Sequence, residues 1–330
     1  MTQDGMTRIK DIRHGRQSDC FFRKMVFQTL CCLLALAMSS ACYSQETRDS
    51  TVYVAGSGNT SLDQHLLSLL QQQLGENANL IPVSDDQVAM IRDTPIVTIG
   101  PSAFSRVRQA NRDAPILAML VKKDFIDGFA SRSPGQVSGI FYDVPLIRQA
   151  VAGQVILPHA TKIALLATTD SVELYEPLID QLAAFRMTAR MFVVNSDDDL
   201  IPTLVRALSY GDFLLAAPDD AIYNPRTIKH ILLTAYRRNK IVIGPSQAYV
   251  RVGSLASNYA PFSAMVKKAS GFIKEYYANG QLPSPAYPDL YRVEINRQVA
   301  RSLNIPLPER AEVEAAVNET LNEHGGADVE

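Results

Sequence analysis

The segment from 208 to 257 constrains the fold most, because it contains two buried-strand patterns joined by a helical pattern. Residues 212–217 form a short apolar run without a helical period, which is typical of a buried strand. Asn224 and the proline after it favour a helix start, and apolar side chains then recur on one helical face, namely Ile228, Ile231, Leu232 and Tyr236. A second apolar run at 241–244 predicts another strand, so the segment predicts a β-α-β unit.

Polar side chains follow both of these strands at their C-terminal ends. Asp219 and Asp220 come after the first strand, and Ser246 comes after the second. Because ligands bind outside the carboxyl ends of strands in open α/β sheets, we expect Asp219 and Ser246 to contact a ligand. The alternative, that Asp219 is a solvated loop acid or a helix cap, stays open at this point.

Strand and helix patterns alternate along the rest of the chain in two blocks. The first block has strand patterns at 51–55, 79–83, 95–99, 115–121 and 137–142. The second block has them at 162–168, 188–194, 212–217, 241–244, 253–257 and 291–295. A length of 330 residues suggests about two domains. The predicted fold class is therefore α/β, with two doubly wound parallel sheets and right-handed crossovers.

One helix start in the first block has the composition of an anion site. Gly100 and Ser102 follow the third strand and open a helix at 103–110. Free N–H groups at a helix N-terminus favour a carboxylate or another anion, although a purely structural cap is an equal alternative.

The first 45 residues read as an export signal, separate from the fold. Residues 1–24 hold six Lys or Arg against three Asp, and residues 25–45 carry no charge. The apolar centre at 30–38 has the length of a signal h-region, and small residues precede Cys42. We therefore expect an exported, periplasmic protein, with an uncleaved membrane anchor as the alternative. Lipid modification of Cys42 stays open, because Ser39 stands where a lipobox usually has leucine.

Composition and motif content argue against several functional classes. The net charge is −2 without a basic stripe, so nucleic acid is not an expected partner. The five His are scattered without metal-ligand spacing, and neither GxSxG nor SxxK occurs. Asp219 and Asp220 are adjacent on an extended segment, so their side chains should point apart. We expect no enzymatic activity, no cofactor and no metal.

Several pieces of the chain between 51 and 308 resemble one protein family. They are TIGPSAF, PILAML and VSGIFYDVP in the first half, and LLAAPDDAI, KIVIGPSQAYVRVGSLAS, ANGQLPSPAYP and VEINRQVARSLNIPLP in the second. The chain resembles the exported substrate-binding components of ABC transporters, in the group that includes tryptophan- and aromatic-amino-acid-binding proteins.

The resemblance implies a type I periplasmic-binding-protein-like fold with two lobes and a hinged cleft. Lobe one would hold 48–141 and 258–290, lobe two would hold 142–257 and 291–312, and 313–330 would be a C-terminal tail. Apart from the resemblance, the residues at 312–323 predict an exposed amphipathic helix. Carried over position by position, the ligand-binding residues would be Ser57, Asn59, Gly100, Ser102, Tyr142, Asp143, Thr169, Asp170, Asp219 and Ser246.

The resemblance also implies a function and partners. The chain would act as a monomer that captures a small, amino-acid-like molecule and delivers it to an ABC permease in the inner membrane. A periplasmic sensory protein that signals to a membrane receptor kinase or cyclase is the alternative, because it would use the same cleft. An exported scaffold without a ligand is the third.

Overall fold

The computed structural model describes residues 50–76 and 78–324. The predicted export segment at 1–45, the lipid-modification site Cys42 and the end of the tail lie outside the described residues. Within the described ranges, no helix combines the length and the apolar character needed to cross a membrane.

Lobe one is built on a five-stranded parallel sheet with the order β2-β1-β3-β4-β5. Its strands are β1 (Ser50–Ala55), β2 (Ala78–Pro82), β3 (Ile96–Ile99), β4 (Ile116–Val121) and β5 (Val137–Phe141). The inner strands β3 and β4 are near-continuous buried apolar runs, as expected where both faces of a parallel sheet are covered, whereas the edge strand β2 is largely exposed or half-buried. The order places the topological switch point between β1 and β3.

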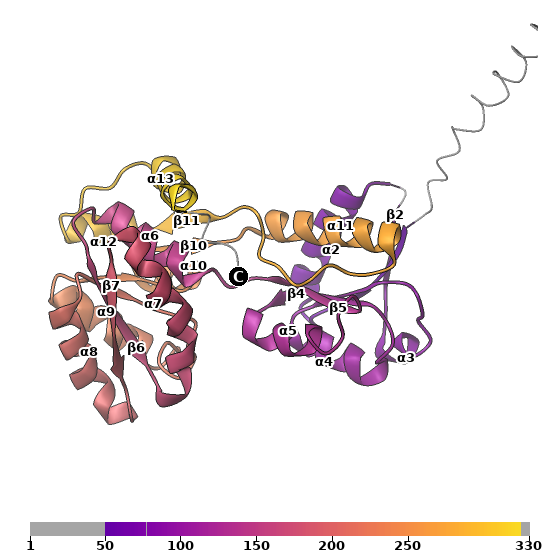
Figure 1. Ribbon diagram of the computed structural model, residues 1–330, viewed down its shortest axis with the longest axis horizontal. Helices are drawn as coiled ribbons and strands as arrows, with labels where there is room; N and C mark the ends of the chain where they lie inside the picture. Colours follow the sequence, from indigo (N-terminus) through magenta and orange to yellow (C-terminus); the bar gives the residue numbers. More distant parts are fainter. Residues whose placement is uncertain (1–49, 77, 325–330) are drawn as a thin grey trace, which may run out of the picture. The chain divides into compact units, whose positions relative to one another are not determined.

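Helices cover both faces of the lobe-one sheet (Figure 1). They are α2 (Thr60–Leu74), α3 (Asp85–Val88), α4 (Pro101–Ala110), α5 (Lys123–Ala130) and, from much later in the chain, α11 (Phe262–Asn279). α2 and α11 lie side by side and bury one core with β1, β3 and β4, in which Leu66, Leu70, Val266 and Ile273 are buried. α4 and α5 bury a second core on the opposite face, around Phe104 and Ile126.

Lobe two is built on a six-stranded sheet with the order β11-β10-β9-β8-β6-β7. Its strands are β6 (Lys162–Ala167), β7 (Thr188–Val193), β8 (Phe213–Leu215), β9 (Ile241–Ile243), β10 (Ala256–Tyr259) and β11 (Arg292–Ile295). β6 to β10 are parallel and repeat the strand order of lobe one, whereas β11 pairs antiparallel with β10 at the edge.

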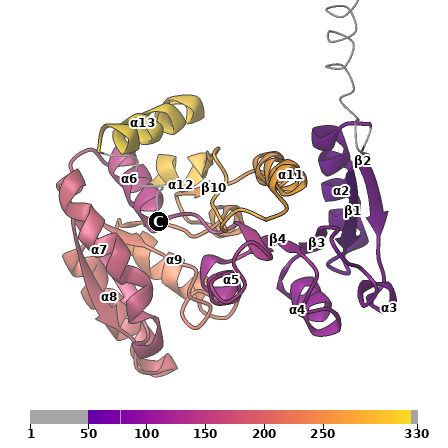
Figure 2. The ribbon, with the colours of Figure 1, turned by 45° about the vertical axis from the view of Figure 1, so that its right-hand side comes forward.

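The helices of lobe two also lie on both faces of their sheet (Figure 2). They are α6 (Leu146–Ile156), the 3-10 helix η1 (Thr169–Tyr175), α7 (Glu176–Leu182), the 3-10 helices η2 (Ala183–Phe185) and η3 (Asp197–Asp199), α8 (Leu200–Tyr210), α9 (Ile228–Arg237), α10 (Gln247–Val252), α12 (Arg297–Ser302) and α13 (Arg310–Glu323). α6 passes so close to β8 that a Cβ on Gly153 would lie 2.6 Å from the Phe213 ring.

The predicted fold class, two doubly wound α/β lobes, is confirmed, but two predicted helices differ. α13 is not an exposed helix, because Val313, Val317 and Leu321 are buried in the lobe-two core and the helix packs on α6. α9 begins at Ile228 rather than at the proline after Asn224. The Asn224 side chain instead accepts hydrogen bonds from the backbone N–H groups of Arg226 and Thr227 and so closes a turn ahead of the helix.

Candidate functional site

A cleft of about 860 Å³ is lined by residues of both lobes. The segments that follow β3, β4 and β5 line the cleft from lobe one, and the segments that follow β8 and β9 line it from lobe two. Residues beside β10 and at the start of α11 complete the lining. The volume lies within the range of small-molecule sites, ~300–1,000 Å³. We therefore treat this cleft as the candidate ligand site.

A β-bulge shapes the lobe-one wall of the cleft. The register between β4 and β5 shifts between Met119 and Val121, and Leu120 has a φ of 56°. This left-handed conformation is costly for leucine, and bulges commonly re-aim side chains beside functional sites. Leu120 and Lys122, on either side of the buried Val121, both line the cleft.

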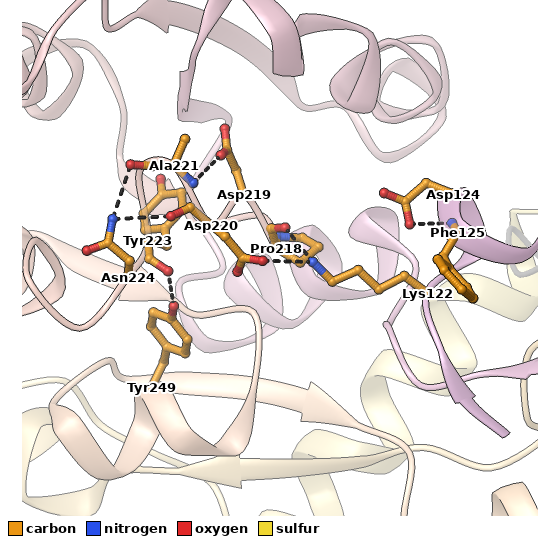
Figure 3. A network of polar contacts seen from close by, with 10 residues as sticks. All are labelled: Lys122, Asp124, Phe125, Pro218, Asp219, Asp220, Ala221, Tyr223, Asn224 and Tyr249. Carbon is orange, nitrogen blue, oxygen red and sulfur yellow. Dashed lines mark hydrogen bonds and ion pairs between the residues drawn. The ribbon is translucent and has the colours of Figure 1, made fainter. Parts of the chain in front are cut away.

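Lys122 connects the two lobes. Its ammonium group Nζ donates a hydrogen bond to the backbone oxygen of Pro218 at 3.2 Å and pairs with Asp220 Oδ2 at 3.4 Å (Figure 3). Burial alone would lower the pKa of Lys122, but nearby Tyr142, Asp220 and Asp124 raise the pKa above its usual value. The lysine is therefore a stable positive charge inside the cleft.

Aromatic side chains give the cleft an apolar character. Those that line it are Phe125, Tyr142, Tyr249, Tyr259 and Phe262. The Tyr142 side chain is 42% exposed, and burial of the remainder raises the pKa of its hydroxyl. Tyr249 donates its hydroxyl hydrogen bond to the backbone oxygen of Tyr223, which fixes the ring against lobe two. Such walls suit a ligand with an aromatic or otherwise apolar body.

Asp143 lies at the start of the first crossing segment, between β5 and α6. Its carboxylate accepts hydrogen bonds from the backbone N–H of Lys123 at 3.2 Å and from the Tyr287 hydroxyl at 3.4 Å. Burial, reinforced by the nearby charge of Asp124, raises the pKa of Asp143 to about 6, although the backbone hydrogen bonds oppose the rise. Asp143 therefore changes its charge in a mildly acidic range.

The floor of the cleft is a buried polar network at the root of the crossing segments. Gln149 of α6 and Asn258 of β10 both line the cleft and are 1% exposed. The backbone N–H of Asn258 donates to Gln149 Oε1 at 2.7 Å, and Gln149 Nε2 donates to the Asn258 backbone oxygen at 3.1 Å. Beside them, the Arg148 guanidinium lies 4.5 Å from the centre of the Tyr291 ring and donates to Asn318 of α13 at 2.7 Å.

A second cavity of about 300 Å³ adjoins the cleft. The residues that it shares with the cleft are Lys122, Asp124, Asp143, Val144, Leu146 and Pro218. Its other lining residues come mainly from α5, η1, α7 and the start of α6. The contact between Lys122 and Pro218 thus lies where the two hollows meet. No group of three or more histidine, cysteine or acidic side chains within 50–76 and 78–324 is arranged to hold a metal ion.

Three of the predicted site residues line the cleft: Tyr142, Asp143 and Ser246. Gly100 and Ser102 flank Pro101, which lines it, while they themselves are not among the lining residues. Ser102 is exposed on the first turn of α4.

Asp219 and Asp220 diverge, as their adjacency predicts. Asp220 is directed toward Lys122 and lines the cleft, whereas Asp219 is directed away from it (Figure 3). Asp219 is 8% exposed, and its Oδ1 accepts a hydrogen bond from the Ala221 backbone N–H at 2.9 Å. The Asp219 Oδ2 atom is buried without a hydrogen-bond partner among the described residues.

The remaining predicted residues lie in local caps away from the cleft lining. Ser57 donates its hydroxyl hydrogen bond to Asp63 Oδ1 at 2.7 Å, and the Asn59 side chain caps α2 by accepting from Leu62 N–H. Thr169 and Asp170 are exposed on η1. These side chains follow β1 and β6, whereas the cleft is formed mainly by the segments after β4, β5, β8 and β9.

The sequence reasoning did not single out Lys122, Gln149, Tyr249 or Asn258. Lys122 carried a signal, because it is a charged residue directly after a predicted apolar strand, as Asp219 is. Gln149 and Asn258 did not stand out in the sequence, because each directly follows another polar residue, Arg148 and Ser257 respectively. Tyr249 lies in the predicted segment after 241–244, but an exposed and a cleft-lining tyrosine look the same in a sequence.

The two-lobed fold is shared with solved structures of low sequence identity. CD0873 from Clostridium difficile, a ligand-free, open substrate-binding protein with adhesive properties, matches with a TM-score of 0.64 and 15% identity, over 79% of this chain and 96% of its own. A conserved domain protein from Vibrio cholerae matches with a TM-score of 0.54 and 17% identity, over 81% and 98%. An ABC domain in complex with L-Trp from Streptococcus pneumonia gives 0.53 and 17%, also over 81% and 98%.

The chain has the type I periplasmic-binding-protein fold. No family model matches it, and no curated protein matches it. At this level of identity the likeness establishes the fold and a structural similarity to ABC substrate-binding proteins. None of the three solved structures is described as an enzyme.

Proposed function

We propose that the chain is a binding protein that captures a small, amino-acid-like molecule in the cleft between its lobes for an ABC transporter. The observation that carries the proposal is the cleft itself, with aromatic walls and Lys122 facing Asp220 across the lobes. An apolar cavity with a few converging polar groups is the usual form of a small-molecule site. The similarity to a substrate-binding protein and to an L-Trp complex supports the ligand class.

The cleft offers complementary groups to each part of such a ligand. The aromatic rings suit an apolar side chain, and the cleft-lining charges are of both signs, Lys122 and Arg251 against Asp124, Asp143 and Asp220. Charge-assisted hydrogen bonds to an ammonium or a carboxylate contribute about 1.5–3 kcal/mol each. The crossing segments that connect the lobes would let them close on the bound molecule.

Native mass spectrometry of the purified protein, followed by calorimetry with the twenty amino acids, tests the proposal. We expect saturable one-to-one binding of at least one compound, and L-tryptophan is the first probe because one structural neighbour binds it. Tyr142→Ala should weaken that binding about tenfold, which corresponds to ~1.4 kcal/mol. Tyr236→Ala is the matched control, since Tyr236 is 44% exposed on α9, close to the 42% of Tyr142, and does not line the cleft. Equal affinity of both variants, or no saturable ligand at all, would count against the proposal.

The partner and the location are part of the same proposal. We infer that the protein is exported through its first 45 residues and meets an ABC permease at the inner membrane as a monomer. Co-purification from the envelope distinguishes the partners, because the transport function requires a permease with its ATPase, whereas the sensory alternative requires a receptor kinase or cyclase.

A further inference from the structure

We propose that the Lys122–Asp220 pair is a latch between the ligand-free lobes. An anionic group on the incoming molecule takes the place of Asp220 beside Lys122, and the bound molecule then holds the lobes together in place of the latch. The inference deepens the proposed function and rests on it. It assigns Lys122 as the residue that selects an anion, most simply a carboxylate, and Asp220 as a built-in competitor for that lysine.

The latch joins segments that belong to different lobes. Lys122 follows β4 of lobe one and Asp220 follows β8 of lobe two, so their 3.4 Å contact joins segments 98 residues apart. The hydrogen bond from Lys122 to the Pro218 backbone oxygen, at 3.2 Å, adds a second link across the same gap. Both links therefore resist separation of the lobes.

The Lys122–Asp220 ion pair is weak enough for another anion to replace Asp220. The Lys122 side chain is 25% exposed, whereas the Asp220 side chain is 87% exposed. A pair with one solvated partner is weak and is screened by salt. Such a contact biases the lobes without fixing them, and another anion can replace Asp220 at a small cost.

Lys122 stays in the cleft as a positive charge when Asp220 leaves. Lys122 lines both the large cleft and the smaller cavity, and its neighbours include the acidic side chains Asp124 and Asp143. The buried part of the lysine keeps the ammonium group in place, and its surroundings keep it charged. A carboxylate that enters beside Tyr142 and Phe125 would therefore meet a fixed cation whose partner across the lobes has left.

The other acids of the site do not duplicate the role of Asp220. Asp143 is engaged by the Lys123 backbone N–H and by the Tyr287 hydroxyl. Asp124 accepts a hydrogen bond from the Phe125 backbone N–H within α5 of the same lobe. Asp220 is the acid that pairs with Lys122 across the lobes among the described residues, so the latch depends on this contact.

A matched ion pair elsewhere in the chain provides the control. Lys268 of α11 pairs with Asp289 at 2.6 Å, with side chains that are 26% and 71% exposed. This pair resembles the proposed latch in exposure, but both residues line a separate hollow together with lobe-one residues. Asp289→Asn therefore removes a comparable ion pair without touching the cleft.

The first test needs no ligand. Spin labels at Met90 in lobe one and Leu233 in lobe two, with the four native cysteines replaced by serine, report the distance between the lobes by pulsed EPR. We expect Asp220→Asn and Lys122→Gln to broaden the distance distribution toward longer values, as should high salt in the unsubstituted background. Asp289→Asn should leave the distribution unchanged. A distribution for Asp220→Asn that equals that of Asp289→Asn would overturn the latch.

The second test uses 3-phenylpropionate, which has a carboxylate and a ring but no ammonium group, and its neutral amide. Asp220→Asn should bind the carboxylate about threefold to fivefold more tightly than the wild type, since an exposed pair is worth up to ~1 kcal/mol. Lys122→Gln should lose the preference for carboxylate over amide, while Arg251→Gln should keep it. Equal affinity for the carboxylate in Asp220→Asn and the wild type, or loss of the preference only in Arg251→Gln, would overturn the assignment.

The two failures are distinguishable. If no amino acid and neither probe binds any form of the protein, the proposed function and the anion selection both fail. The EPR distances are then the test of whether Lys122 and Asp220 hold the lobes together. If L-tryptophan binds but Asp220→Asn changes neither the distances nor the carboxylate affinity, the proposed function stands and the latch is refuted.

Discussion

Gln149 and Asn258 exchange hydrogen bonds in the buried floor of the cleft, and so tie the first turns of α6 to the end of β10. Asn258 Nδ2 also donates to the Arg148 backbone oxygen at 3.0 Å. Arg148 in turn contacts Tyr291, which packs into the core that α11 shares with lobe one. The chain crosses between the lobes three times: between β5 and α6, between β10 and α11, and between α11 and β11. These three segments therefore start or end beside one polar network.

Gln149→Leu should destabilise the protein strongly. The substitution leaves the buried N–H groups of Asn258 without the acceptor Gln149 Oε1. Buried donors without partners cost about 1–3 kcal/mol each, so we expect a loss of about 2–4 kcal/mol in the free energy of unfolding. Urea denaturation measures it. Gln72→Leu on the exposed side of α2 is the control, and a similar small effect for both variants would contradict the role of the network.

Two glycines in helices should respond to alanine in opposite directions. A Cβ on Gly153 of α6 would lie 2.6 Å from the Phe213 ring, so Gly153→Ala should destabilise lobe two by about 1–3 kcal/mol. Gly271 of α11 has nothing within 4 Å of its added Cβ, and Gly271→Ala should stabilise by up to ~1 kcal/mol. Thermal melting of both variants checks the pair. A stabilising Gly153→Ala would show that α6 and β8 are not in close contact.

Asp143 should make stability depend on mildly acidic pH. Its pKa is about 6 in the folded protein, mainly because of burial, against ~3.9 for an unfolded aspartate. Between these values the folded state binds more protons than the unfolded state, so the free energy of unfolding falls as pH rises through this window. The whole penalty, about 3 kcal/mol, is present above pH ~6.

Asp143→Asn tests this dependence directly. The variant should be more stable than the wild type at neutral pH and should lose the difference near pH 4. Asp180→Asn on the exposed face of α7 is the control and should run parallel to the wild type. A wild-type stability that rises with pH between 4 and 6, with Asp143→Asn unchanged in slope, would refute the burial account.

Substitution of Asp219 should affect the stability of the protein, whereas substitution of Asp220 should affect ligand affinity. Because Asp219 is buried and accepts from Ala221 N–H, the structure predicts that Asp219→Ala lowers the melting temperature through a loss of about 1–3 kcal/mol. The sequence pattern predicts the reverse, a loss of ligand affinity with stability held. Asp220→Ala should spare stability and alter ligand affinity, since its side chain is exposed in the cleft. Calorimetry of L-tryptophan binding with both variants decides which acid faces the ligand.

The fold was predictable because apolar periodicity and chain order determine it. The alternation of strands and helices led to two α/β lobes, and the resemblance supplied their pairing. The burial of α13 could also have been predicted, because Val313, Val317 and Leu321 recur four residues apart on one face of the helix. Its core is formed with α6, which lies far away in the sequence, so the partner of that face was not visible.

The site was less predictable because it depends on the directions of single side chains. Asp219 closes a turn by accepting a hydrogen bond from the Ala221 backbone N–H. This turn determines that Asp220, and not Asp219, faces the cleft. Lys122 reaches lobe two from the end of a strand that has a bulge at Leu120. The local sequence propensity does not predict this bulge. Ser57 and Asn59 have the polar groups expected of a ligand contact, but helix capping uses the same groups.

Small-angle scattering of the protein with and without its bound molecule tests the central claim most directly. A ligand bound between two lobes that are joined by crossing segments should draw the lobes together at saturation and so reduce the radius of gyration. The measurement uses the compound that native mass spectrometry identifies, at a concentration where calorimetry shows full occupancy. A smaller radius of gyration at saturation is the predicted result, and an unchanged radius with the ligand fully bound would contradict capture in this cleft.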